Sequence, residues 1–199
     1  MGMTHVCVGT MAALMLTELR SPRDCLAALI GGALGAAACD MDLGRQAHQM
    51  DADRTRRAAL GIAAACLAVD FLLNAGLIRR MRTSSPENLA AGVLGLTMLY
   101  LWGSQQPHRG ATHSVLMVVL MGFCMKLVCA PVSVPLMIGM GSHLVLDLFN
   151  RKPVQLLYPV HGGVCLGLCR ADGALDRMIR GTALLGTVFA LGMGIRGFL

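Results

Sequence analysis

The chain has 199 residues, of which 55% are hydrophobic and only 14% are charged. Soluble domains average about 25% charged residues, so this composition argues against an ordinary soluble domain and leaves a soluble all-helical bundle as the alternative. The net charge of +6 would suit nucleic acid, but the Arg residues cluster at the ends of apolar stretches, in RTRR, RRMR and NRK, where Lys and Arg typically meet membrane headgroups. We therefore expect a membrane partner and no nucleic-acid partner.

Seven apolar segments follow one another along the chain. Their approximate limits are residues 3–17, 25–39, 58–78, 89–104, 114–134, 136–149 and 181–198. Several are shorter than the roughly 20 residues of a full membrane span, so we expect short or interfacial helices among them. The segments predict an all-α fold, a polytopic membrane helical bundle that forms a single domain over residues 1–199.

If the chain crosses the membrane at every apolar segment, the polar connections alternate between the two membrane faces. They comprise ELRSPRD, a loop over residues 40–57, RRMRTSSPEN, SQQPHRGATHS, the PVSVP break and residues 150–180. Alternating crossings bring seven polar side chains to the face where the chain begins: His5, Asp40, Asp42, His108, His113, His143 and Asp147. This face also carries more Lys and Arg than the other, so the positive-inside rule places it in the cytoplasm.

The segment GSHLVLDLFN carries His143 and Asp147 four residues apart. On a helix these two side chains lie on one face, one turn apart, where an imidazole and a carboxylate can share a divalent cation. The alternative is that Asp147 orients His143, or that both cap a helix end. Ionisable groups in an apolar segment are costly and usually paired or functional, which favours the metal site.

The stretch HRGATHS places His108 and His113 around a turn before an apolar helix. Thr112 or Ser114 is a candidate cap for that helix. Arg109 can hold a phosphate or carboxylate through two parallel hydrogen bonds. The alternative is a polar loop whose histidines face water.

The stretch CDMD places Asp40 and Asp42 at the end of the second apolar segment. If the backbone is extended there, the two carboxylates point in opposite directions, so one can bind metal while the other braces a neighbour. A solvated helix end is the alternative. His5 is a lone histidine near the chain start, and only its expected membrane face makes it a candidate.

A set of imidazoles and carboxylates without cysteine suits zinc, with manganese or iron as alternatives. The eight cysteines contain no CxxC pair, so we expect neither a disulfide framework nor a cysteine zinc site. The ligands could hold one ion, or two ions roughly 3.5–4 Å apart, and lower the pKa of a bound water toward about 7. A carboxylate or His would relay protons and Arg109 would stabilise negative charge, which together describe hydrolysis of an ester or phosphoester.

These stretches resemble the YdjM family, which is described as LexA-regulated, membrane-bound metal-dependent hydrolases of the bacterial inner membrane. The resemblance rests on MTHVCVG, CDMD, HRGATHS, GSHLVLDLFN and KPVQLLYPV, and covers about residues 3–160. It implies an inner-membrane location, a divalent metal cofactor and hydrolase activity. The implied metal ligands are His5, Asp40, Asp42, His108, His113, His143 and Asp147. The resemblance implies Arg109 as a substrate or structural partner, and we predict Asp42, Arg109 and His113 as the catalytic residues.

His48 and His161 lie outside these motifs, and we do not expect either to bind metal. Residues 150–180 are expected either to cover the site as an interfacial lid or to form an ordinary amphipathic connector. The favoured function is a hydrolase acting on a lipid or another amphiphile. A membrane metal-ion transporter or metal-binding protein is the alternative, and a membrane scaffold without catalysis is a third possibility.

Overall fold

The structure, a computed structural model, describes residues 2–43, 49–160, 162–168 and 173–196. These residues form seven α-helices and two 3₁₀ segments, and contain no β-strand, only one isolated bridge between Val154 and Val164. The elements are α1 (Gly2–Leu16), α2 (Pro22–Ala38), η1 (Cys39–Leu43), α3 (Gln49–Leu73), α4 (Leu77–Arg82), α5 (Pro86–Gly103), η2 (Ala111–His113), α6 (Val115–Leu148) and α7 (Ala174–Arg196). The predicted all-α fold is confirmed.

Three helices begin at a serine whose hydroxyl accepts a hydrogen bond from a backbone N–H in the first turn. Ser21 caps α2, Ser85 caps α5 and Ser114 caps α6. In α2 and α5 a proline follows the cap directly, where its fixed φ suits the first helical turn and its missing N–H costs nothing. Ser114 thus fixes where HRGATHS ends and α6 begins.

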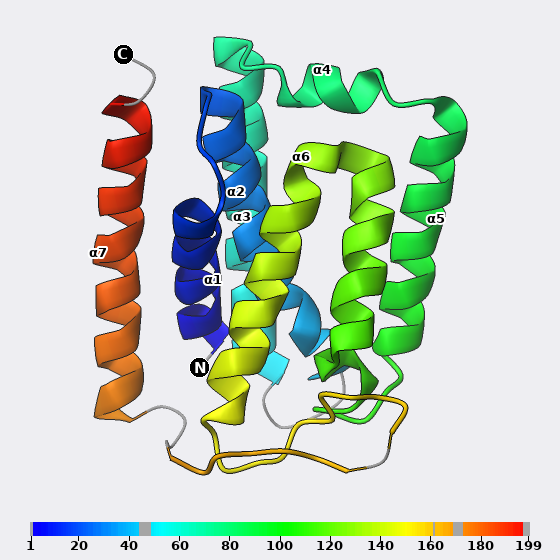
Figure 1. Ribbon diagram of the computed structural model, residues 1–199, viewed down its shortest axis with the longest axis vertical. Coiled ribbons are helices and arrows are strands. Elements are labelled where there is room, and N and C mark those ends of the chain that lie inside the picture. The colour runs from blue at the N-terminus through cyan, green and yellow to red at the C-terminus, as the bar shows by residue number, and fades with distance from the viewer. Residues whose placement is uncertain (1, 44–48, 161, 169–172, 197–199) are drawn as a thin grey trace.

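The long helices run side by side, and the polar connections lie at the two ends of the bundle (Figure 1). The short helix α4 crosses one end, between α3 and α5. The N-terminus of α1, η1, η2 and the connection from α6 to α7 all lie at the opposite end. This second end therefore receives chain segments that are far apart in the sequence.

Helix α6 doubles back on itself (Figure 1). Cys129 departs from helical geometry (φ −154°, ψ 92°) two residues before Pro131, which cannot donate a backbone hydrogen bond to the preceding turn. The hydroxyl of Ser133 donates to the carbonyl oxygen of Gly122 at 2.7 Å and joins the two halves. The break was predicted over PVSVP and lies at Cys129, and the return it produces brings His143 to the end of the bundle where α6 starts.

Helix α2 packs tightly between α1 and α6 through small residues. A Cβ atom on Gly32 would lie 2.6 Å from the carbonyl oxygen of Gly9 in α1, and one on Gly139 in α6 would lie 2.5 Å from that of Gly32. Membrane helices commonly use such residues to bring backbones close together. The close approach of α2 and α6 makes direct contact between an α2 backbone group and an α6 side chain possible.

Apolar side chains cover the outside of the bundle. Within the described residues, three helical segments are long and apolar enough to cross a membrane: Pro22–Leu43, Val115–Leu148 and Ala174–Arg196. Large hydrophobic side chains such as Phe71, Leu185 and Val188 are more than half exposed. Many large exposed hydrophobic side chains on apolar helices of this length fit lipid and not water, so the chain is a membrane protein.

Several sequence-predicted boundaries are wrong. The predicted loop over residues 40–57 is partly helical, because η1 covers its start and α3 begins at Gln49, well before the apolar segment 58–78. Helix α4 begins just before the predicted connection RRMRTSSPEN and occupies its first four residues, and the first two backbone N–H groups of α4 donate to the Asp70 carboxylate at 2.8 Å each. Polar composition hid both elements, since neither α4 nor the first turns of α3 are apolar.

Candidate metal centre

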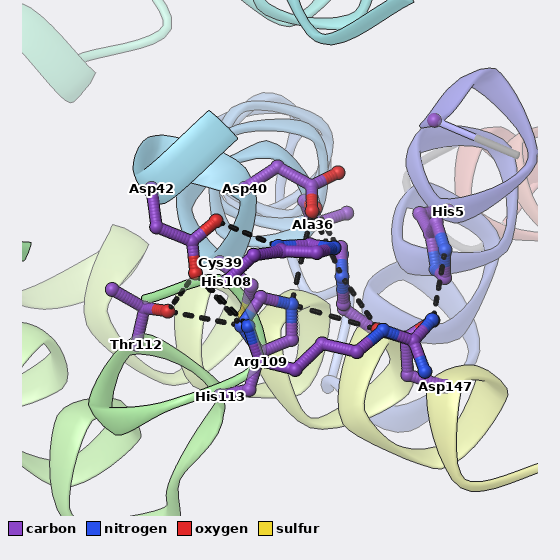
Figure 2. Close-up of polar contacts among 12 residues, drawn as sticks. His5, Ala36, Cys39, Asp40, Asp42, His108, Arg109, Thr112, His113 and Asp147 are labelled. Atoms are coloured by element: carbon purple, nitrogen blue, oxygen red, sulfur yellow. Dashed lines mark hydrogen bonds and ion pairs between the residues drawn. The ribbon is translucent and has the colours of Figure 1, made fainter. Parts of the chain in front are cut away.

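The structure brings the seven predicted residues together at one end of the bundle. His5 comes from α1, the two aspartates from η1, His108 and His113 from the turn before α6, and the last pair from the end of α6. All except His108 are buried. Figure 2 labels all of them except His143 and shows the labelled side chains pointing toward one another.

Four atoms form the centre of this cluster, and we call them the four-atom set: Nε2 of His113, Nε2 of His143, Oδ1 of Asp40 and Oδ2 of Asp147. Nε2 of His113 lies 3.7 Å from the Asp40 oxygen and 3.5 Å from the Asp147 oxygen. Nε2 of His143 lies 3.6 Å and 3.8 Å from the same two oxygens. Each nitrogen thus faces both carboxylates at more than a hydrogen-bond distance.

The four nitrogen–oxygen separations in the four-atom set, 3.5–3.8 Å, are close to those around a bound divalent cation. A tetrahedral ion with ligands at about 2.0–2.2 Å separates its ligand atoms by roughly 3.3–3.6 Å. The Nε2 atoms of both histidines are buried and have no hydrogen-bond partner among the described residues. Buried polar atoms are rarely left unpaired, and a shared cation would satisfy both nitrogens and both carboxylates at once.

The backbone of α2 fixes which nitrogen of His143 is available. Nδ1 lies 2.7 Å from the carbonyl oxygen of Ala36. A carbonyl oxygen only accepts, so Nδ1 carries the hydrogen and donates it. Nε2 is therefore the nitrogen left to bind a cation, the arrangement in which metal-binding histidines are usually held.

The hydroxyl of Thr112 fixes which nitrogen of His113 faces the other ligands. The Thr112 hydroxyl donates to Oδ2 of Asp42 at 2.5 Å and lies 2.9 Å from Nδ1 of His113. Because the single hydroxyl hydrogen is used on the carboxylate, the Thr112 oxygen accepts from Nδ1. A chain of hydrogen bonds therefore runs from His113 through Thr112 to Asp42 and leaves Nε2 of His113 facing the four-atom set.

Asp42 is the anchor of the HRGATHS turn. Its Oδ1 lies 2.9 Å from Nδ1 of His108, and its Oδ2 also accepts from the backbone N–H of Arg109 at 3.3 Å. Both carboxylate oxygens thus serve protein donors. Asp40 and Asp42 lie in a 3₁₀ turn and not in an extended stretch, yet their carboxylates still take different partners, and Asp42 lies outside the four-atom set.

His5 and His108 flank the four-atom set on opposite sides. The His5 ring stacks on the His143 ring with centroids 3.8 Å apart, and its Nε2 lies 3.7 Å from Oδ1 of Asp147. Two groups of side chains each place one ligand atom apiece within 4.8 Å of one another: His5 with His143 and Asp147, and His108 with Asp40 and His113. Adjacent groups of three ligands are compatible with one ion or with two.

Arg109 binds a protein carboxylate. One terminal nitrogen donates to Oδ1 of Asp147 at 2.8 Å and the other to the carbonyl oxygen of Lys152 at 2.6 Å. Its backbone lies in the left-handed region (φ 66°), which is uncommon for residues other than glycine. The guanidinium thus connects Asp147 to the segment after α6, which covers part of this end of the bundle (Figure 1).

The pKa of His113 reflects its position among acids. Burial alone would lower this pKa, but the nearby carboxylates of Asp40 and Asp42 favour the charged ring, outweigh burial and raise the pKa to about 9. At neutral pH the metal-free ring therefore holds a proton on Nε2 as well. A bound cation would take the place of that proton.

Two contributors to the site were not predicted from the sequence. Thr112 was expected only as a possible helix cap, although Ser114 is the residue that caps α6. The carbonyl oxygen of Ala36 carries no signal in the sequence, because any residue supplies one. His48 and His161, which were not expected to bind metal, lie outside the described residues.

Comparison of the sequence with known proteins finds the same family that the sequence motifs resemble. The uncharacterized protein YvsG of Bacillus subtilis (strain 168) is 35% identical over 74 residues, which make up 36% of this chain and 46% of the relative, so the chain spans under half of that protein. No solved structure matches the chain significantly. The model of the YdjM inner membrane protein family matches residues 1–197. The chain, with its buried His/Asp cluster, therefore belongs to the YdjM family of inner membrane proteins.

Proposed function

We propose that this protein is an integral-membrane metal-dependent hydrolase that acts on an ester or phosphoester of a lipid or another amphiphile. The observation that carries the proposal is the four-atom set, in which two unpartnered buried imidazole nitrogens face two carboxylate oxygens at 3.5–3.8 Å. Zinc is the first candidate for the ion, and manganese or iron are the alternatives, because all three accept imidazole and carboxylate ligands.

A divalent cation at this site would supply Lewis-acid polarisation of an ester oxygen and a lowered pKa for bound water. The protein's own groups would hold and orient the ligands. Asp42, through Thr112, fixes the ring of His113, and Arg109 holds Asp147. We therefore assign Asp42 and Arg109 mainly to positioning, whereas the sequence predicted catalytic roles for both.

The position of the cluster supports a substrate drawn from the membrane. The cluster lies at one end of a bundle whose sides are apolar (Figure 1). When the hydrocarbon tail of a lipid remains in the bilayer, the ester or phosphoester bond of its headgroup lies near the membrane surface, at about the depth of the cluster. Alternating crossings of the sequence assign more Lys and Arg to this end of the bundle than to the other, which favours the cytoplasmic face of the inner membrane.

A metal-ion transporter fits these features less well. Transporters usually place their ion sites near the bilayer midplane, on broken helices. The break in α6 is at Cys129, 14 residues before His143, which corresponds to about 20 Å along a helix. The broken part of α6 and the His/Asp cluster are therefore at different depths.

Hydrolysis and transport are distinguished by assaying one preparation in two ways. Purified protein in liposomes is supplied with zinc, manganese or iron and screened for release of phosphate or headgroup from phospholipids and alkyl phosphates. The same liposomes, loaded with a metal-sensitive dye, report metal flux. We expect metal-dependent release that is lost with a chelator and in His143→Ala.

The control variant is Glu87→Gln, which removes an exposed carboxylate at the start of α5, far from the cluster. It should hydrolyse as wild type does. Metal flux without hydrolysis would support the transporter and overturn the proposal.

A further inference from the structure

An apolar cavity lies beside the His/Asp cluster. Its volume is about 430 Å³, which is within the usual range for ligand pockets. Side chains of α2, α3, α5 and α6 line it, among them Leu34, Leu60, Leu96 and Met121. Among the described residues that line it, Arg56 is the one with a charged side chain.

The cavity opens toward the side of the bundle. Leu60 on α3 and Tyr100 on α5 both line it, and they are 61% and 46% exposed. Helices α3 and α5 are joined by α4 at the end of the bundle away from the cluster (Figure 1). A hydrocarbon chain in the bilayer can therefore reach the cavity laterally, without passing through water.

Arg56 connects the cavity to the cluster. One terminal nitrogen donates to the backbone carbonyl of Asp40 at 3.1 Å. The other reaches Oδ1 of Asp53 at 3.5 Å, while Nε is buried and has no partner among the described residues. The guanidinium thus lies next to a residue of the four-atom set and retains a free donor.

We propose that this cavity is the binding site for the hydrocarbon chain of an anionic phosphate amphiphile, whose phosphate is held by Arg56 and directed toward the cluster. This inference rests on the proposed hydrolase and specifies its substrate class. The lining disfavours a polar or charged tail, because the Tyr100 hydroxyl and the Arg56 guanidinium are the polar side-chain groups among its described residues and could not compensate such a tail along its length. The guanidinium selects an anionic head over a cationic one.

Photolabelling of metal-free wild type tests the proposal without turnover. The full chain is placed in nanodiscs of neutral phosphatidylcholine with a chelator, and a long-chain alkyl phosphate with a diazirine in its chain is added. After irradiation, adducts are located by peptide mass spectrometry. We expect adducts on Leu34, Leu96 or Met121, competed by unlabelled alkyl phosphate and not by an alkyltrimethylammonium of equal chain length.

Two matched pairs of variants separate binding from general lipid contact. Arg56→Gln should lower cavity labelling about tenfold, as expected for loss of a charge-assisted hydrogen bond, while Arg57→Gln at the exposed neighbouring position should not. Leu60→Trp, which narrows the opening from an exposed position, should also lower it. Leu72→Trp, on the same helix but outside the cavity, should leave it unchanged.

Adducts confined to exposed residues such as Phe71 and Leu185 would overturn the proposal, as would equal competition by the cationic amphiphile. The same experiments distinguish failure of the cavity assignment from failure of the hydrolase proposal. A cavity that is labelled in protein that hydrolyses nothing contradicts only the hydrolase, whereas hydrolysis of the alkyl phosphate without cavity adducts contradicts only the assignment of the cavity.

Discussion

The carbonyl oxygen of Ala36 lies 2.7 Å from Nδ1 of His143, so the backbone of α2 orients a side chain of α6. The contact depends on close packing of α2 and α6 through glycines such as Gly32 and Gly139. Gly139 lies about one helical turn before His143. The proposed metal affinity is therefore linked to helix packing as well as to the ligands themselves.

The first prediction concerns this packing. Gly139→Ala places a Cβ atom 2.5 Å from the carbonyl oxygen of Gly32 and must push α6 away from α2. We expect metal affinity to fall about 10–100-fold, the usual effect of disturbing the groups that orient a ligand. The control is Gly141→Ala on the same helix, where an added Cβ meets nothing within 4 Å. Equal affinities in the two variants would contradict the link.

Thr112 provides a second prediction. Thr112→Val keeps the side-chain volume but removes the hydroxyl between Asp42 and His113. Both partners are then left buried with one hydrogen bond fewer, so metal affinity should fall about 10–100-fold. Thr112→Ser retains the hydroxyl and should bind nearly as wild type does. The zinc affinity of both variants is measured by titration in competition with a chromogenic chelator. Tight zinc binding by Thr112→Val would disprove the role of Thr112.

Asp42 and Asp147 are expected to behave differently when neutralised. Asp42→Asn loses an anchor of the HRGATHS turn, so we expect weaker metal binding with unchanged stoichiometry. Asp147→Asn removes an oxygen of the four-atom set and a partner of Arg109, so saturable binding should be lost. Metal content after dialysis against a limiting chelator compares the variants. Complete loss of metal in Asp42→Asn would instead support the ligand role predicted from the sequence.

The pH dependence of stability tests the environment of His113. Its pKa is raised from the model-peptide value of 6.5 to about 9. A raised pKa in the folded state stabilises the metal-free protein fully below about pH 6.5, and this contribution is lost as the pH rises through about 9. The Tm of metal-free wild type should therefore fall between pH 6.5 and 9 by more than the Tm of His113→Asn. Parallel Tm curves for the two proteins would contradict this assignment.

Much of the cluster could be predicted from the sequence because its members lie at the ends of apolar segments. Alternating crossings place such ends on the same face, and hydrophobicity reveals the segments. His143 and Asp147 were expected to share a helix face, and their atoms are 3.8 Å apart. The prediction that they bind metal remains to be tested.

Features that depend on packing could not be predicted. Helix α4 forms because the carboxylate of Asp70 caps it, a contact between two segments that no local pattern reveals. Arg56 lies in RTRR and was interpreted as a headgroup flank, whereas its neighbours are the Asp40 carbonyl and an apolar cavity. Distances likewise decide which residues we assign as metal ligands and which as positioning residues. Asp40 and Asp42 are the same residue type in one short stretch, so the sequence alone does not distinguish them.

Metal binding by the purified protein tests the central claim most directly. Protein stripped with a chelator is titrated with zinc, manganese or iron, and bound metal is measured by elemental analysis. The four-atom set predicts saturable uptake of one or two ions per chain in wild type and Glu87→Gln, and loss of that uptake in a folded His143→Ala variant. Wild type that takes up none of these ions, or His143→Ala that binds them as wild type does, would contradict it.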